Sequence, residues 1–245
     1  MTAARRFFVE GRSEIGGSVE IAGGDAHKIA HVLRLRAGDR IEIIDSAAGT
    51  FVAAIEVVGP TVRATLVERV AERLEAGAAL DLEVAQAVPK GRRMDFVIEK
   101  CTELGAAAFL PFYSERSVSR DVGSEKLSRW QRLARVAAQQ SGRRDVPRIA
   151  MPIEFDALAQ TFGEYAAVLF AWEMAQTAPL RERLTSALPS AGRVLIVIGP
   201  EGGFTHAEAE LAERCGAALV WLGARILRTD TAAIVLLAVI GALTS

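Results

Sequence analysis

The spacing of apolar residues divides the chain into two parts with different periods. In residues 1–72, short runs of alternating or β-branched residues are separated by turn-forming GG, AGD and GP, which is typical of closely spaced strands. The runs are RRFFVE, SVEIA, DRIEIID, TFVAAIEVV and TVRATLVERV. One helix, expected over residues 25–33 with Asp25 as its N-cap, interrupts them. This pattern predicts a small β-barrel.

From residue 80 onward, strands alternate with helices. The strand runs are LDLEVAQAV, AAFLPF, AAVLFA, VLIVIG and ALVWLG, and apolar stripes between them predict helices over residues 92–104 and 124–141. A third helix, residues 206–215, begins with the capping-box spacing of Thr205 and Glu208. The alternation predicts βαβ units and a five-stranded parallel sheet. We place the domains at residues 1–72 and 73–245, with residues 71–79 as a connector.

The last predicted helix, residues 232–243, is apolar on nearly every face. Such a helix must be buried, and we expect it to pack against the sheet and against another subunit. It is too short to span a bilayer, and the N-terminus lacks the apolar region of a signal peptide. Cys101 and Cys215, the two cysteines, fall on predicted helices, which suggests reduced thiols and a cytoplasmic protein. His27 and His31 are spaced i,i+4 without a third ligand, so we expect no metal site.

The charge distribution is more informative than the net charge of −1. Residues 84–148 hold 13 Lys and Arg against 7 Asp and Glu, whereas residues 149–245 hold 6 against 10. A local basic face, not the total charge, is what a nucleic-acid-binding protein needs, although a solvated helix surface gives the same composition.

Three strand ends carry unusual loops, which are LFAWEM (169–174), GPEGGF (199–204) and LGARILRTDTA (222–232). Ligands of open α/β sheets bind outside the carboxyl ends of the strands, so these loops are expected to converge on one site. The glycines of GPEGGF permit positive φ and leave no Cβ in the way of a ligand. The alternative for that loop alone is a tight turn without a ligand.

The pair GPEGGF and LGARILRTDTA closely resembles the pattern of the SPOUT superfamily of methyltransferases. Within it, the match is to the bacterial family that methylates uridine N3 in 16S ribosomal RNA of the small subunit. The stretches AVPKGRRMDFVIEKCTELGAAAFLPFYSERSV, QQSGRRDVPRI and HVLRLRAGDRIEIID are similar to the same family. The resemblance therefore covers essentially the whole chain. One departure is Asp230, where the family has Glu in RTET, so the reach of that carboxylate is one methylene shorter.

This resemblance implies an α/β fold that composition does not reveal. Its C-terminal SPOUT domain would be a parallel-sheet methyltransferase domain tied in a trefoil knot, and its N-terminal domain a PUA-like RNA-binding β-barrel. It also implies S-adenosylmethionine as cofactor, an obligate homodimer, and 16S rRNA or an assembled small ribosomal subunit as partner. No metal and no membrane are implied.

Methyl transfer from a sulfonium needs an aligned nucleophile and exclusion of water. Backbone groups and apolar walls of the three loops would hold the cofactor. The candidates are Leu169, Phe170, Glu173, Ile198, Gly199, Pro200, Glu201, Gly202, Gly203, Leu222, Gly223, Arg225, Ile226, Leu227, Arg228, Thr231 and Ala232.

The catalytic candidates follow from the acidity of uracil N3–H. Arg228 is the best-placed residue to stabilise negative charge on the uracil oxygens. Glu201 or Asp230 would accept the proton or hold the arginine in place. The alternative for Arg228 and Asp230 is a structural ion pair that orders their loop.

Phosphate contacts supply much of the affinity for RNA. The candidate residues for these contacts are Arg34, Arg36, Arg40, Lys90, Arg92, Arg93, Arg143 and Arg144. The arginines at positions 129, 132 and 135 recur along one face of a predicted helix, and a solvated surface explains them as well as contacts with RNA do.

Three other functions fit parts of the pattern. The chain could be a SPOUT-type RNA methyltransferase with a different target nucleotide, or a non-enzymatic RNA-binding protein. A nucleotide-phosphate enzyme is disfavoured, because the chain has no GxxxxGK[ST] and residues 149–245 contain no lysine.

Overall fold

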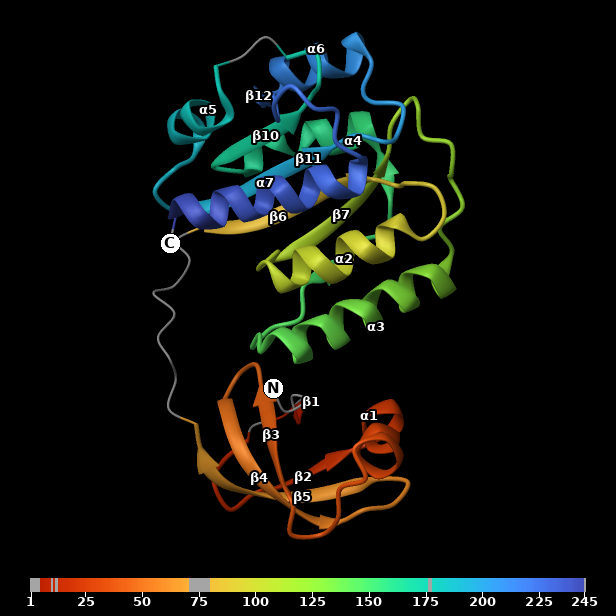
Figure 1. The fold of residues 1–245 in the computed structure, drawn as a ribbon, viewed down its shortest axis with the longest axis vertical. Coiled ribbons are helices and arrows are strands. Elements are labelled where there is room, and N and C mark those ends of the chain that lie inside the picture. Colours follow the sequence, from red (N-terminus) through yellow and green to blue (C-terminus); the bar gives the residue numbers. More distant parts are fainter. Residues whose placement is uncertain (1–4, 10, 12, 71–79, 176–177, 245) are drawn as a thin grey trace. The chain divides into compact units, whose positions relative to one another are not determined.

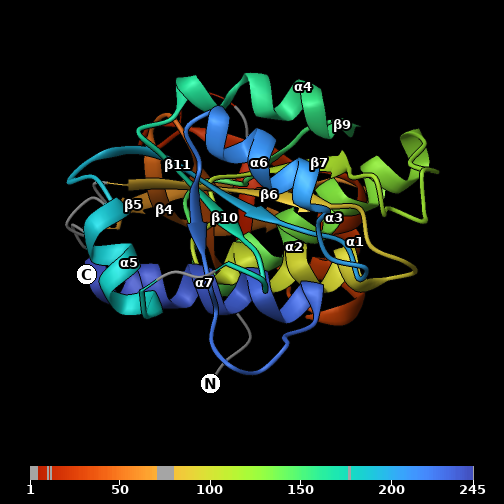
Figure 2. The same ribbon diagram turned by 90° about the horizontal axis from the view of Figure 1, so that it is seen from above.

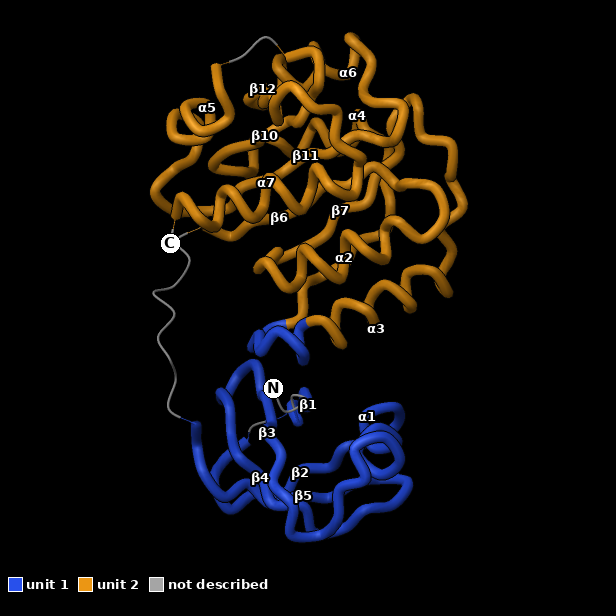
Figure 3. The backbone as a smooth tube through the Cα atoms, in the orientation of Figure 1, with its two compact units in different colours: residues 1–75, 138–145 blue, residues 76–137, 146–245 orange. Residues whose placement is uncertain are grey.

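The computed structural model describes every residue except 1–4, 10, 12, 71–79, 176–177 and 245. The chain divides into two compact units, residues 1–75 with 138–145 and residues 76–137 with 146–245 (Figure 3). The expected connector over residues 71–79 lies outside the described residues. Because residues 138–145 group with the first unit, that unit is discontinuous in sequence, which the expected boundary at residue 72 did not anticipate.

The first unit is a curled five-stranded sheet in the order β1-β3-β4-β5-β2 (Figure 1). Only the β1–β3 pair is parallel among the paired strands of this sheet. In β4, Phe51, Ala53 and Ile55 are buried and alternate with less buried residues, because successive side chains of a strand point to opposite faces. All five predicted strands are present. They are β1 (Arg6–Val9), β2 (Ser18–Ile21), β3 (Arg40–Asp45), β4 (Gly49–Val57) and β5 (Val62–Arg69).

The helix of the first unit differs from its prediction. It begins as α1 (Gly23–His27), with Ala22 as N-cap, and continues as the π-helical turn η1 (Lys28–Val32). The prediction of Asp25 as N-cap was wrong, because Asp25 lies within the first helical turn. Ala26 and Ile29 are buried in the core of this unit, so the segment packs one apolar face against the sheet.

The second unit contains a parallel sheet in the order β12-β10-β11-β6-β7-β8, with β9 also paired to β7. All of its strand pairs are parallel, as predicted. The count of five strands was wrong, because two-residue strands β8 and β9 are too short to give a periodic signal. The strands are β6 (Leu80–Ala87), β7 (Ala108–Tyr113), β8 (Arg148–Ile149), β9 (Ile153–Glu154), β10 (Ala167–Ala171), β11 (Gly192–Ile198) and β12 (Ala218–Val220).

Helices cover both faces of this sheet (Figures 1 and 2). One core contains buried residues of α2, α3 and α7, and the other contains buried residues of α4 and α6. Helix α6 begins with the predicted capping box of Thr205 and Glu208. The helical segments are α2 (Arg93–Glu103), α3 (Ser124–Ser141), α4 (Phe155–Gln160), η2 (Phe162–Glu164), α5 (Leu180–Ala187), α6 (His206–Arg214) and α7 (Thr229–Thr244).

Helix α7 starts at Thr229, earlier than the predicted residue 232. One face of α7 is fully buried within a single chain, because Leu236, Leu237 and Ile240 are inaccessible to solvent. Ile234 and Val235 are only half-buried. The apolar surface of α7 is therefore buried on the side that faces the sheet of its own chain and partly exposed on the opposite side. The trefoil knot of the resemblance stays a prediction.

Candidate functional site

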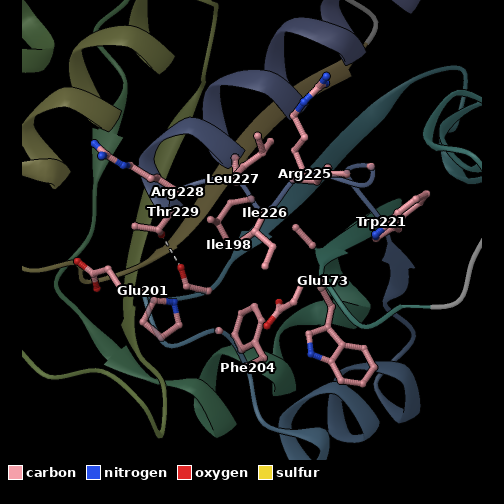
Figure 4. A pocket seen from close by; sticks show the side chains of 18 of the residues that line it. Glu173, Ile198, Glu201, Phe204, Trp221, Arg225, Ile226, Leu227, Arg228 and Thr229 are labelled. Atoms are coloured by element: carbon pink, nitrogen blue, oxygen red, sulfur yellow. Dashed lines mark hydrogen bonds between the residues drawn. The ribbon is translucent and has the colours of Figure 1, made fainter.

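Three loops start at the same edge of the parallel sheet. Ala171, at the end of β10, pairs with Ile198 on one side and with Val220 on the other. The segments that follow these residues enclose a cavity of about 460 Å³ (Figure 4). The structure thus brings together the three loops that the sequence singled out.

Most of the predicted cofactor residues line this cavity. Those that do are Glu173, Ile198, Gly199, Pro200, Glu201, Gly203, Leu222, Gly223, Arg225, Ile226, Leu227, Arg228 and Ala232. Leu169, Phe170, Gly202 and Thr231 are not part of the lining. Leu169 and Phe170 are fully buried in the two cores on opposite faces of the sheet, so they support the wall from inside the protein.

Glycines in the GPEGGF loop lie where a side chain has no room. Gly203 has a φ of +68°, and a Cβ there would collide with Oε1 of Glu173. A Cβ on Gly199 would lie 2.9 Å from Cε2 of Phe204. The ring of Phe204 is buried and lies 4.1 Å from that of Phe170, centroid to centroid. The loop is therefore built from glycine for close packing inside the cavity wall as well as for its turn.

Glu201 is anchored to the segment after β6. Its Oε1 accepts a hydrogen bond from the backbone N–H of Lys90 at 2.9 Å and forms an ion pair with the Arg93 guanidinium. Burial opposes ionisation, but the N–H groups of Lys90 and of Glu201 itself, together with Arg93, outweigh it and lower the pKa of Glu201. The carboxylate is thus ionised at neutral pH and joins two segments that are far apart in sequence. The arginine that it holds is Arg93, not Arg228 as expected.

Arg116 holds the next residues of the same loop. Its Nη1 donates to the carbonyl of Gly202 at 2.8 Å, and a Cβ on Gly202 would lie 3.3 Å from the Cβ of Arg116. Arg116 follows β7 and was not among the predicted site residues. No local motif could indicate it, because its partner is 86 residues away in the chain.

Arg228 and Asp230 do not form the ion pair considered as an alternative. No salt bridge joins them in the described part of the chain, and Oδ1 of Asp230 accepts a hydrogen bond from the N–H of Thr231 at 3.1 Å. Asp230 therefore sits at the start of α7, where a negative charge is favourable. The side chain of Arg228 is exposed and lies on the side of the cavity where Glu201 lies, whereas Arg225 extends in another direction (Figure 4).

The cavity also contains residues that sequence reasoning missed. Trp172, Trp221 and Phe204 add aromatic surface to its lining, and Arg93 belongs to the lining although it was predicted to contact RNA. Both tryptophans come directly after strands, in the stretches LFAWEM and ALVWLG. Their position at strand ends was a usable signal that the prediction did not apply.

The candidate RNA-contacting residues fall in both units. Arg34, Arg36, Arg40, Arg143 and Arg144 belong to the first unit, and Lys90, Arg92 and Arg93 to the second. All are exposed except Arg93 and Arg143, which are half-buried and pair with Glu201 and Asp145. Arg34 is the only residue other than glycine with a positive φ, +53°, among those described.

The described residues contain neither a candidate metal site nor a candidate membrane-spanning helix. No group of three or more His, Cys, Asp or Glu side chains there is placed to hold a metal ion. None of the described helices combines the length and the apolar character needed to cross a membrane.

Two protein-family models match the chain. Residues 77–241 match an RNA methyltransferase domain, and residues 21–62 match an RNA methyltransferase PUA domain. The first match spans more than half of the chain and contains all three cavity loops.

Full-length relatives carry one common name. Ribosomal RNA small subunit methyltransferase E of Bacillus subtilis is 33% identical over 240 residues, which cover 93% of this chain and 92% of the relative. The protein of the same name from Mycobacterium tuberculosis is 34% identical and covers 99% of this chain and 93% of its own length.

Solved structures show the same fold. Ribosomal RNA small subunit methyltransferase E from Neisseria gonorrhoeae, bound to S-adenosylmethionine, superposes with a TM-score of 0.86 at 27% identity, covering 98% of both chains. A protein of Legionella pneumophila in complex with the same cofactor gives a TM-score of 0.84 at 28% identity, also covering 98% of both chains. Family models, full-length relatives and fold agree, and the chain belongs to the ribosomal RNA small subunit methyltransferase E family.

Proposed function

We propose that this protein transfers the methyl group of S-adenosylmethionine to N3 of a uridine in 16S rRNA. The observation that carries the proposal is the cavity at the carboxyl edge of the parallel sheet, with an exposed arginine, Arg228, in its lining. Relatives named for methylation of small-subunit ribosomal RNA support the substrate class.

The residues of the cavity fit this cofactor. Glycine at positions 199 and 203 keeps the loop free of side chains that would collide with Phe204 and Glu173. The Gly199 carbonyl and the Gly203 N–H are used by Thr229 and Pro200, so other backbone groups of the loop are the ones that can face a ligand. The aromatic rings of Trp172 and Trp221 provide apolar surface for an adenine ring. When bound, S-adenosylmethionine supplies an electrophilic methyl group on a sulfonium, whose sulfur becomes a neutral thioether after transfer.

Arg228 stabilises the negative charge that develops on the uracil oxygens as the N3 proton is lost. Its exposed side chain can approach a base from the solvent side of the cavity. The N3 lone pair released by this deprotonation forms the new bond to the methyl carbon. Arg228 is thus assigned to charge stabilisation.

The two carboxylates of the predicted catalytic set have different roles. Glu201 is committed to Lys90 and Arg93, so we assign it to holding the GPEGGF loop. Asp230 lies outside the cavity lining but directly follows the lining residue Thr229. It is half-exposed and not paired with a basic residue in the described part of the chain, so we assign it as the acceptor of the N3 proton.

The protein acts on RNA through basic residues of both units. Arg36 and Arg40 in the first unit and Lys90 and Arg92 in the second are exposed and suited to phosphate contacts. The match of residues 21–62 to the PUA domain of RNA methyltransferases supports this use of the first unit.

A homodimer is the assembly that the apolar surfaces support. Val235 of α7 is only half-buried, and Ile226 in the loop before α7 is 89% exposed. A substitution that tests this surface must avoid residues such as Leu237, whose side chain is fully buried in the core of the single chain. We expect Val235→Glu to remain folded and to become a 26 kDa monomer by light scattering, and an unchanged dimer would contradict this face.

The test of the activity is mapping of the product. Purified protein, S-adenosylmethionine and small ribosomal subunits that lack the modification should yield 3-methyluridine at one position, identified by mass spectrometry of RNA fragments. Naked 16S rRNA is the parallel substrate, which distinguishes free RNA from the assembled subunit.

Two variants sharpen this test. Arg228→Ala should lower kcat by about 100-fold or more with little change in cofactor affinity, because its charge acts on the reacting base. Arg225→Ala is the matched control, since it lines the same cavity but extends away from Glu201. Methylation of another nucleotide, or equal kcat in both variants, would contradict the assignment.

A further inference from the structure

A buried hydrogen-bond chain joins three segments that meet at the cavity. Nε2 of Gln86, near the end of β6, donates to Oγ1 of Thr229 at 2.8 Å. That hydroxyl donates to the carbonyl of Gly199 at 2.5 Å, the bond drawn as a dashed line from Thr229 in Figure 4. Gln86 is fully buried, and Thr229 is 6% exposed. Gly199 begins the GPEGGF loop and Thr229 begins α7, so the chain ties both cofactor-facing loops to the central strand.

The direction of the chain follows from the groups themselves. A carbonyl oxygen can only accept, so the single proton of the Thr229 hydroxyl must go to Gly199. The hydroxyl oxygen must then accept from Gln86, which fixes the orientation of its amide. The same Nε2 also donates to the carbonyl of Ala87 at 3.1 Å, so both of its hydrogens are used.

This orientation leaves the other end of the amide unsatisfied. Oε1 of Gln86 is buried and has no hydrogen-bond partner among the described residues. A buried acceptor without a partner is destabilising, and an apolar side chain of similar size would remove that penalty. Stability alone therefore does not explain glutamine at position 86. The feature that remains is the hydrogen bond by which its Nε2 positions the Thr229 hydroxyl.

The strand register strengthens this point. Gln86 is the direct partner of Ile198, the last residue of β11 before Gly199. Thr229 and Ile198 both belong to the cavity lining, whereas Gln86 does not. Gln86 thus acts from behind the cavity wall on two residues that form it.

We propose that Gln86 is a positioning residue for cofactor binding, which acts through the Thr229 hydroxyl to hold the GPEGGF loop and the start of α7 in their binding arrangement. This proposal rests on the proposed function, because the ligand of the cavity is S-adenosylmethionine. Without this relay, the hydrogen-bond chain from Gln86 through Thr229 to Gly199, the two loops are no longer tied to strand β6. The loops then sample arrangements in which the cavity does not fit the cofactor, and the apparent affinity falls with the fraction of competent protein.

The experiment compares stability with cofactor affinity in the full chain. Gln86→Leu removes an unpaired buried acceptor together with two donated hydrogen bonds, so its urea unfolding midpoint should stay close to that of the wild type, while its Kd for S-adenosylmethionine by calorimetry rises about tenfold. Hydrogen exchange of residues 199–204 in the cofactor-free protein should become faster. Glu83→Gln is the control on the same strand, because it removes a buried charge in the middle of β6, away from the cavity lining, and should lower stability with an unchanged Kd.

Substitutions at Thr229 decide the case if Gln86→Leu does not fold. Thr229→Ala should raise the Kd as Gln86→Leu does, Thr229→Ser should restore it, and the double variant of Gln86→Leu with Thr229→Ala should show no further loss. A folded Gln86→Leu with wild-type Kd, or a Thr229→Ser as weak as Thr229→Ala, would overturn the relay alone. A wild-type protein without measurable affinity for S-adenosylmethionine would overturn the proposed function as well.

Discussion

Two buried polar residues of strand β6 are used in opposite ways. In the middle of the strand, the carboxylate of Glu83 accepts from Nε of Arg193 at 3.1 Å and from the Tyr165 hydroxyl at 3.0 Å. Burial and the nearby charge of Glu83 raise the pKa of Tyr165 to about 12, so its proton stays in that hydrogen bond. Near the carboxyl end, Gln86 leaves one acceptor unpaired beside a loop in which Gly203 has positive φ.

This difference indicates that Glu83 stabilises the fold, whereas Gln86 positions the loops of the cofactor site. Glu83 lies away from the cavity and its contacts are satisfied, so it contributes to the free energy of unfolding. The carboxyl edge instead retains an unsatisfied buried acceptor and a loop whose turn requires glycine at position 203. Substitutions at Glu83 and at this edge should therefore affect different measurements.

The largest expected effect on stability is at Glu83. Glu83→Gln removes the charge that faces Arg193 and should lower the free energy of unfolding by about 2 kcal/mol, less than the usual value for a broken buried pair because Arg193 is 41% exposed. Urea unfolding measures this loss. The cofactor Kd of the folded variant should equal that of the wild type, and weaker binding would contradict the separation of Glu83 from the cofactor site.

The second effect compares two glycines with positive φ. Gly203 has a φ of +68° and faces Glu173, whereas Gly216 has a φ of +93° and open space within 4 Å of the place that a Cβ would take. Alanine at either position should lower stability by about 1 kcal/mol through backbone strain. Only Gly203→Ala should also weaken binding of S-adenosylmethionine, which quenching of the fluorescence of Trp172 and Trp221 can measure. Equal cofactor affinity in the two variants would contradict the role of Gly203 in the cavity.

Local features of the fold could be predicted from the sequence. The capping box of Thr205 and Glu208 and the bounds of helix α3 depend on residues a few positions apart, so the pattern contains the information. The three strand-end loops could also be placed at one edge, because parallel strands align their carboxyl ends.

The contacts that hold the site could not be predicted in this way. Glu201 pairs with Arg93 across 108 residues, and Gln86 bonds Thr229 across 143 residues. Such pairs depend on the strand order and on the path of each loop, which periodicity does not specify. The resemblance to a known family identified most of the cavity residues, but it did not show the lining tryptophans or that Glu201 faces Arg93 instead of Arg228.

The third prediction concerns the anchor supplied by Arg116. Arg116→Ala removes the hydrogen bond to the Gly202 carbonyl and should destabilise the loop by about 1 kcal/mol, with a several-fold weaker cofactor Kd. Arg120→Ala is the matched control in the same segment, because Arg120 pairs with Glu154 instead of the GPEGGF loop. Calorimetry on both variants tests this, and an equal loss in both would contradict a specific anchor.

The smallest expected effect is the pH dependence contributed by Glu201. Its pKa in the folded protein is lowered from 4.5, so its contribution to stability is present above the unfolded value and is lost as the pH falls through the folded value. Wild type should exceed Glu201→Gln by about 0.5 kcal/mol in free energy of unfolding at pH 7, since the ion pair with Arg93 is partly exposed. The difference should vanish as Glu201 becomes protonated in the folded state.

Chemical denaturation from pH 7 down to the lowest pH at which both proteins fold measures this difference. Glu210→Gln on α6 removes one negative charge from an exposed position of the same unit and controls for net charge. A difference between wild type and Glu201→Gln that stays constant over the acidic range would mean that the ionised carboxylate adds no stability to the folded loop. The assignment of Glu201 to holding the GPEGGF loop through Arg93 would then be withdrawn.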